Sequence, residues 1–86
     1  MPSSSSQFDA YNEELQSILS KLRSSLKLCT DAPSLANLKV VHDLLQQGDD
    51  ILKQMGLEAR GVDEADMKRE LLGKVRYNTY QLIILT

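Results

Sequence analysis

Apolar residues recur at alternating spacings of three and four along the stretch from Ser34 to Arg60, around which the rest of the chain is organised. Side chains with this spacing lie above one another on one face of an α-helix. The stripe is wider than the seam of a two-stranded coil, so it predicts a central helix packed against two others. The stripe consists of Leu38, Val41, Leu45, Leu52 and Met55, and is widened by Leu44 and Ile51.

Two further segments show the same period and predict helices over residues 7–29 and 64–84. In the first, acidic residues lie in the early turns and basic residues late, which complements the helix dipole. In the third helix, Asn78 stands where an apolar residue is expected. The first stripe consists of Phe8, Tyr11, Leu15, Ile18, Leu22 and Cys29, with Leu19 and Leu26 beside it. The third helix offers Met67, Leu71, Leu72, Val75, Leu82 and Leu85, with Glu64–Lys68 and Glu70–Lys74 as outer ion pairs.

Two short breaks separate the helices. Around Pro33, either Asp31 or Ser34 can cap the second helix. At the second break, Gly61 suits the left-handed position that ends a helix in a Schellman motif. There we expect Asp63 to cap the third helix, and Val62 to pack on Leu57 and Met67.

These elements predict an all-α fold, an antiparallel up-down-up three-helix bundle over residues 7–86. Residues 1–6 are expected to form a disordered, serine-rich tail. We expect a monomer with its apolar stripes facing inward. Gly48 and Gly56 lie on or beside the central stripe, where they predict a close helix approach or a bend, or alternatively a binding notch.

Composition narrows the function further. The 86 residues make one domain, and the net charge of −2 gives no basic excess that would favour nucleic acid or an anionic membrane surface. A single cysteine, Cys29, excludes an internal disulfide and a cysteine-based zinc site. No secretory signal or transmembrane segment is evident, because the longest apolar run, 82–85, is far shorter than the ~20 residues that span a bilayer. That run is apolar all round, so we expect part of it to be exposed, as a contact surface or at a point where a longer chain was cut.

Candidate chemistry is sparse, and we expect no catalytic, cofactor-binding or metal-binding residues. His42 is the only histidine and has no evident nucleophile or second ligand nearby. Asp49 and Asp50 are adjacent on a helix and point about 100° apart, so they do not converge on one ion. Tyr77 and Tyr80 are the candidate protein-binding residues, although both also fit the edge of the core. We expect Tyr11 and Cys29 to be buried in the core.

Three stretches, FDAYNEEL (8–15), ILKQMGLEAR (51–60) and LLGKVR (71–76), occur in an order and spacing typical of one family. The chain resembles the N-terminal, Habc-type domain of the Vti family of vesicle SNAREs, which belong to the Qb class. The resemblance covers nearly the whole chain. Gly56, where the family usually has an acidic residue, and the segment after Arg76 depart from the family pattern.

The resemblance implies a regulatory or adaptor-binding domain in vesicle-mediated protein transport and membrane fusion. It would act on the cytosolic face of Golgi, endosomal or vacuolar membranes, and bind SNAREs and vesicle-coat or epsin-like adaptors. A membrane would be reached only through a C-terminal anchor that this chain lacks. One alternative is a structural helical module of an unrelated assembly. A third interpretation is a small helical enzyme with an active site between the helices. Such a site needs inward-facing arginines or lysines, which the first and third helices mostly lack.

Overall fold

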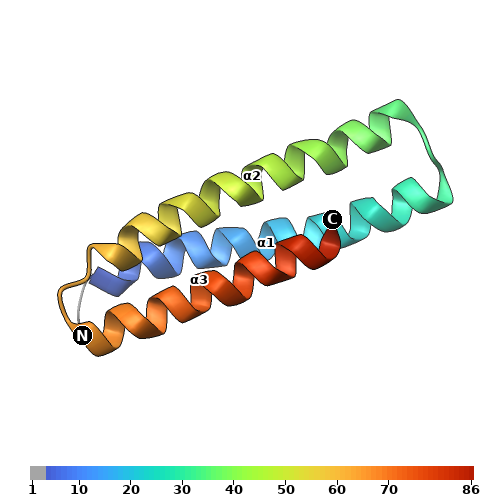
Figure 1. Ribbon diagram of the computed structural model, residues 1–86. Coiled ribbons are helices and arrows are strands. Elements are labelled where there is room, and N and C mark those ends of the chain that lie inside the picture. The colour runs from blue at the N-terminus through green and yellow to red at the C-terminus, as the bar shows by residue number, and fades with distance from the viewer. Residues whose placement is uncertain (1–3) are drawn as a thin grey trace.

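A computed structural model describes residues 4–86, which form three helices and no strand. The helices are α1 (Ser4–Asp31), α2 (Leu35–Arg60) and α3 (Ala65–Leu85). They run up, down and up, side by side, in a rod with extents of 48 × 19 × 16 Å (Figure 1). The prediction of an all-α, antiparallel three-helix bundle is therefore confirmed.

The predicted helix boundaries match the structure closely for α2 and α3. The first helix was predicted to start at residue 7, but α1 begins at Ser4 and ends at Asp31. Residues 4–6 are therefore helical and do not belong to a disordered tail, while residues 1–3 of that predicted tail lie outside the described part of the chain. Backbone N–H groups in a first turn have no intrahelical partner, so serines are tolerated there.

In the loop between α1 and α2, Ser34 is the N-terminal cap of α2. Ser34 has an extended backbone, and its hydroxyl oxygen accepts a hydrogen bond from the N–H of Asn37 at 3.0 Å. The Asn37 side-chain amide donates back to the Ala32 carbonyl at 2.6 Å, which closes the turn. Asp31, the other candidate cap, ends α1 and pairs with Lys27 at 3.5 Å.

The prediction of a left-handed Gly61 is wrong. Gly61 has φ −79° and ψ −5°, a right-handed conformation open to any residue. Its N–H is shared between the carbonyls of Leu57 and Glu58, both at 3.2 Å, and Val62 N–H donates to the Ala59 carbonyl at 3.3 Å. The helix therefore ends by tightening its last turn with i→i−3 bonds, and the left-handed reversal of a Schellman motif is absent here.

The cap of α3 lies one residue later than expected. The Glu64 carboxylate, not that of Asp63, accepts the N–H of Met67. Glu64 is thereby engaged at the helix start and forms no pair with Lys68, whereas the expected Glu70–Lys74 pair is present at 4.0 Å.

Val62 belongs to the core, and Met67, one of its two predicted partners, packs half-buried against the same core. The Val62 side chain is buried in the core, whereas Leu57 is 58% exposed. The burial of Val62 is therefore a property of the core as a whole, and its predicted contact with Leu57 stays a prediction.

Replacing Gly61 by alanine should stabilise the protein by about 0.4–1 kcal/mol, because alanine restricts the unfolded chain without straining the observed backbone. An added Cβ would lie 3.6 Å from the carbonyl oxygens of Glu58 and Leu57, an ordinary contact. Urea unfolding of Gly61→Ala against the unmodified chain measures the change. A loss of about 1 kcal/mol or more would instead indicate a left-handed Gly61 in solution.

The core fills the space between the three helices, and Gly48 lets α3 approach α2 closely. A Cβ at Gly48 would lie 3.3 Å from Leu82 Cδ1, which supports the predicted close helix approach. Most of the fully buried side chains belong to α1 and α2. The buried apolar residues are Phe8, Leu15, Ile18, Leu19, Leu22, Val41, Leu44, Ile51, Leu52, Met55, Ala59, Val62, Leu71 and Leu82.

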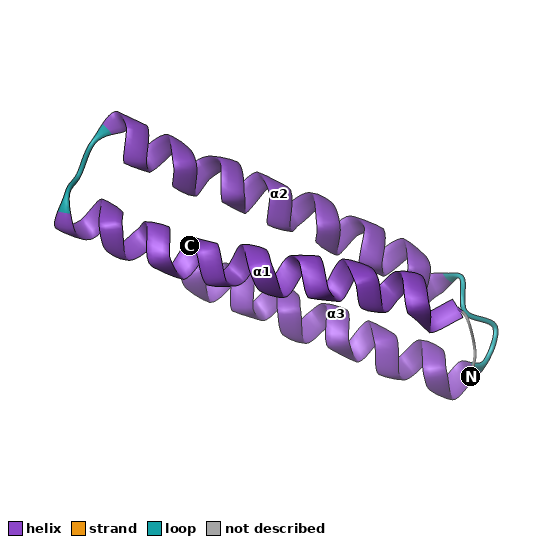
Figure 2. Cartoon of the chain, turned by 180° about the vertical axis from the view of Figure 1, so that it is seen from behind, coloured by secondary structure: helices purple, strands orange, loops and turns teal. Residues whose placement is uncertain are grey.

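The expectation that every apolar stripe faces inward is wrong at one end of the bundle. Leu38 is 55% exposed and Leu45 is only half-buried, although both belong to the central stripe. The reason is length, since α3 has 21 residues and α2 has 26. The α1–α2 hairpin continues past the end of α3, as both views show (Figures 1 and 2).

Candidate functional site

From Tyr77 to Thr86, α3 and its cap carry no charged side chain. Its inner side contributes Leu82 to the core, and Leu85 packs half-buried against it. A helix that is apolar on all sides leaves apolar surface uncovered unless other elements surround it. Here only α1 and α2 pack on α3, so its remaining side faces outward.

The outward side is formed by four exposed side chains, which we call the α3 outer patch: Tyr77 (64% exposed), Tyr80 (61%), Ile83 (62%) and Ile84 (57%). Tyr77, Tyr80 and Ile84 are spaced i, i+3, i+7 and so follow one line along the helix. The sequence left open whether the two tyrosines belong to the core edge or to the surface, and the structure places both on the surface. Their role in protein binding stays a prediction.

Beneath Tyr77, three amide side chains join α3 to α1. Asn78 is only 4% exposed, and its Nδ2 donates to Asn12 Oδ1 at 3.0 Å. Gln16 Nε2 donates to Asn78 Oδ1 at 3.1 Å and to Asn12 Oδ1 at 3.2 Å. We call these residues the amide triad. They explain how a polar residue occupies a core position, because its hydrogen bonds are satisfied within the bundle.

A hollow of about 510 Å³ lies over the amide triad, between α1 and α3, with Tyr77 at its edge. Its lining offers amide donors and acceptors and an aromatic ring. The only charged residues that line it, Glu70 and Lys74, pair with each other at 4.0 Å. At Gly73 a Cβ would meet nothing within 4 Å, so this side of the helix is open to a partner. The arrangement suits the docking of another protein by hydrogen bonds and apolar contact.

The acidic pair considered for a metal lies on the surface of α2. Asp49 is engaged with Lys53, with 3.1 Å between carboxylate and ammonium. This hydrogen bond, together with the attraction of the negative charge, raises the pKa of Lys53 above its ordinary value. Across residues 4–86, no three His, Cys, Asp or Glu side chains come together as a metal ion would require.

Four further residues were considered for a functional or core role: His42, Cys29, Tyr11 and Gly56. His42 is exposed on α2, at the edge of the core stripe. Cys29 and Tyr11 were expected in the core, and both pack against it but are only half-buried. Gly56 lines a second hollow, of about 410 Å³ between α2 and α3, and a Cβ there would only touch the Arg60 guanidinium at 3.9 Å. The structure thus shows no close helix approach that requires Gly56.

Comparison of the chain with models of known protein families, with curated proteins and with solved structures finds no match. None of the described helices combines the length and apolarity needed to cross a membrane.

Sequence reasoning identified two of the four residues of the α3 outer patch and indicated the others, because the run 82–85 is apolar on all sides. It missed the exposed part of α2 around Leu35 and Leu38. The signal that could have found this region is the difference in length between the second and third helices, because a shorter third helix cannot cover the whole stripe.

Proposed function

We propose that this chain is a protein-binding domain without catalytic activity that docks a partner on the α3 outer patch. The observation that carries the proposal is the exposure of Tyr77, Tyr80, Ile83 and Ile84 on an uncharged stretch of helix. A contiguous exposed apolar surface of this kind is typical of interaction sites. Tyrosines are also over-represented among the residues that dominate binding energy.

The expected interaction is modest and reversible. The patch spans about two turns of one helix, so the whole interface should bury on the order of 1,200–1,600 Å², with the amide-lined hollow beside Tyr77 as its polar rim. An affinity in the micromolar range, about −8 kcal/mol, fits a transient contact of this size.

For the biological role, we propose the N-terminal regulatory domain of a vesicle SNARE that acts in protein transport and membrane fusion at Golgi, endosomal or vacuolar membranes. Its partners would be SNAREs and vesicle-coat or epsin-like adaptors. The support is the resemblance of residues 8–15, 51–60 and 71–76, which come together at one end of the bundle (Figure 1). Phe8 and Met55, from the first two of these stretches, are fully buried, so the shared residues build the fold and leave the contact surface free to differ.

The test is affinity capture from a cytosolic extract, with the whole chain as bait. The unmodified chain should recover vesicle-coat adaptors or SNAREs. The double variant Tyr77→Ser, Tyr80→Ser should lose them by about tenfold or more, because exposed aromatic anchors often carry 2 kcal/mol or more each. Exposed substitutions normally change stability by less than about 0.5 kcal/mol, so the double variant should still fold.

Leu28→Ser is the matched control, because Leu28 is 53% exposed on α1, away from the α3 outer patch. It should capture the same proteins as the unmodified chain. Capture of a metabolic complex in place of trafficking proteins would contradict the proposed role, as would turnover of a small molecule by the pure chain. Equal capture by the tyrosine variant would show that the partner does not bind through the tyrosines of the α3 outer patch.

A structural module of an unrelated assembly is the second candidate, and the exposure of Ile83 and Ile84 at the end of α3 favours it. Such a module would join one partner helix permanently. It would then be recovered from cells as a stable complex of fixed composition, whereas a sorting domain would release its partners on dilution.

A further inference from the structure

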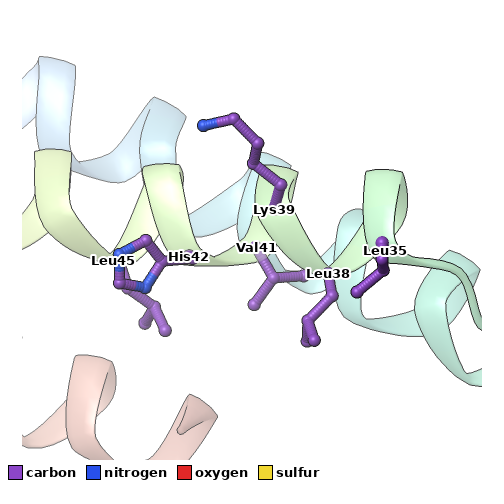
Figure 3. A pocket seen from close by; sticks show the side chains of 6 residues that line it. All are labelled: Leu35, Leu38, Lys39, Val41, His42 and Leu45. Atoms are coloured by element: carbon purple, nitrogen blue, oxygen red, sulfur yellow. The ribbon is translucent and has the colours of Figure 1, made fainter.

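The hollows of the bundle differ in the charge that they present to a ligand. At the start of α2, a hollow of about 520 Å³ is mainly apolar, and its Lys39 extends away from the leucines (Figure 3). The ammonium of that lysine is paired with Asp43 at 3.3 Å. By contrast, Arg60 lines the hollow of about 410 Å³ between α2 and α3, which we call the Arg60 hollow.

Gly56 determines where the Arg60 guanidinium lies. The two residues are four apart on α2, so they lie on the same face of the helix. A Cβ at Gly56 would be 3.9 Å from both terminal nitrogens of Arg60 and 4.0 Å from the carbon that joins them. These nearly equal distances mean that the flat face of the guanidinium lies against α2. A side chain longer than that of alanine at position 56 would occupy the same space.

The Arg60 guanidinium is held in this position without a polar partner. Within residues 4–86, its side chain forms no hydrogen bond and no ion pair. Asp49 and Lys53, the other charged residues that line the Arg60 hollow, pair with each other at 3.1 Å. The hollow therefore carries one net positive charge, with the N–H donors of the guanidinium unused.

A carboxylate is the group that fits this charge and geometry. Two parallel N–H groups of a guanidinium match the two oxygens of a carboxylate, and its single negative charge balances the hollow. A phosphate group, with a charge of about −1.5 to −2, would place excess negative charge beside Asp49.

Apolar side chains surround the guanidinium. Leu52 is buried, Val75 is half-buried, and Leu57 is 58% exposed at the edge of the hollow. Leu57 therefore offers a contact to an apolar side chain next to the bound acidic residue, and that contact would exclude water from the ion pair.

The Arg60 hollow adjoins the α3 outer patch. Thr79 lines the hollow, and Ile83 of the patch follows it four residues later, on the same face of α3. A protein that covers the patch on this side can therefore also reach the Arg60 guanidinium.

We propose that the Arg60 hollow binds an aspartate or glutamate carboxylate of the protein that docks on the α3 outer patch, with an apolar neighbour of that residue against Leu57. The inference rests on the proposed protein-binding function, and it adds the chemistry by which the partner is selected: an acidic residue beside an apolar one.

The probe is the blocked dipeptide acetyl-glutamyl-leucinamide, titrated into the whole chain. Nuclear magnetic resonance follows the Arg60 Nε–H signal and the Gly56 backbone amide, which should shift together and saturate in the millimolar range. Acetyl-glutaminyl-leucinamide is the matched neutral probe and should bind about fivefold more weakly or worse, because it cannot form a charge-assisted pair. Raising the salt concentration should weaken binding of the acidic probe only.

Variants at the two positions separate charge from placement. Arg60→Gln should weaken binding of the acidic probe about fivefold or more, and Arg60→Lys should be intermediate, because an ammonium lacks the planar fork. Gly56→Leu should weaken binding by displacing the guanidinium. Gly56→Ala is its matched control and should bind as the unmodified chain does, since a Cβ at 3.9 Å is an ordinary contact. Circular dichroism melting confirms that each variant is folded.

Equal binding of the two dipeptides, or equal binding of the acidic one to Arg60→Gln, would overturn the proposal. Tighter binding of inorganic phosphate than of the acidic dipeptide would overturn the assignment to a carboxylate. A dimer in sedimentation equilibrium that Arg60→Gln dissociates would assign the carboxylate to a second copy of the chain, and so would overturn the assignment to a partner.

Affinity capture separates this inference from the proposed function. Both Arg60→Gln and the double variant Tyr77→Ser, Tyr80→Ser should recover less of the same proteins than the unmodified chain. Undiminished capture by Arg60→Gln, with loss in the tyrosine variant, would refute the carboxylate site and leave the docking surface on α3 in place. Undiminished capture by both variants would refute both.

Discussion

Leu15→Ala should lower the free energy of unfolding by about 2–5 kcal/mol. Leu15 is fully buried in α1. Removing its outer carbons loses their transfer free energy and leaves a cavity that the helices cannot fully close. For a domain of 86 residues, whose total stability is on the order of 5–10 kcal/mol, this is a large fraction. Urea unfolding followed by circular dichroism gives the difference directly.

Leu38→Ala is the matched control, because the same atoms are removed from a side chain that is 55% exposed. We expect a loss below about 1 kcal/mol, since no closed cavity forms. The sequence pattern alone places both leucines in the core and would assign them similar losses. Equal losses at the two positions would show that Leu38 is covered in solution, and would contradict its exposure in the structure.

Asn78→Asp should destabilise the bundle by about 2–4 kcal/mol at pH 7. The substitution replaces the amide that donates to Asn12 Oδ1 by an ionised oxygen that cannot donate. It also places a charge at a position that is only 4% exposed and has no cation in the amide triad. Burying a charge without a partner costs more than losing a neutral hydrogen bond.

The penalty should depend on pH in a defined direction. Burial raises the pKa of the introduced carboxyl above its unfolded value of about 3.9. The penalty is therefore complete above the raised pKa, shrinks as the pH falls through it, and is smallest near pH 4, where the protonated acid can again donate. Unfolding of Asn78→Asp and of the unmodified chain at the same series of pH values isolates this difference.

Two substitutions at the amide triad serve as controls. Asn12→Asp should cost less than about 1 kcal/mol, because Asn12 Oδ1 only accepts hydrogen bonds there and its side chain reaches solvent. Asn78→Leu should be neutral or stabilising, since it restores an apolar residue at a core position. A similar loss for both aspartate variants would show that Asn78 is hydrated and that the triad does not hold α3 against α1.

The amide triad also illustrates a limit of pattern reading. Asn78 stands out in the sequence only as a break in an apolar stripe. Its partners lie more than 60 residues away on α1, and no local rule connects them. In the sequence, Asn12 and Gln16 look like any other pair of polar residues on a helix surface, so nothing there indicates their role. Only the packing of α3 against α1 brings the three amides within hydrogen-bonding distance.

The turn at Gly61 shows a related limit. Glycine after a helix most often signals a left-handed end, but a right-handed glycine satisfies the same carbonyls through i→i−3 bonds. Both conformations lie within glycine's range. The choice between them depends on where α3 must begin and on the burial of Val62, which are properties of the assembled bundle.

The sequence by itself determined the three helices and most of the core and narrowed the cap of α2 to Asp31 or Ser34, because these depend on the period of apolar residues and on local hydrogen bonds. It also indicated an exposed apolar surface near the C-terminal end of α3. The tertiary structure decided which part of each stripe is covered, because coverage depends on the relative lengths and positions of helices that are far apart in the chain. That is why Leu38 is exposed although it continues the stripe of Val41, and why Asn78 is buried although it interrupts its own.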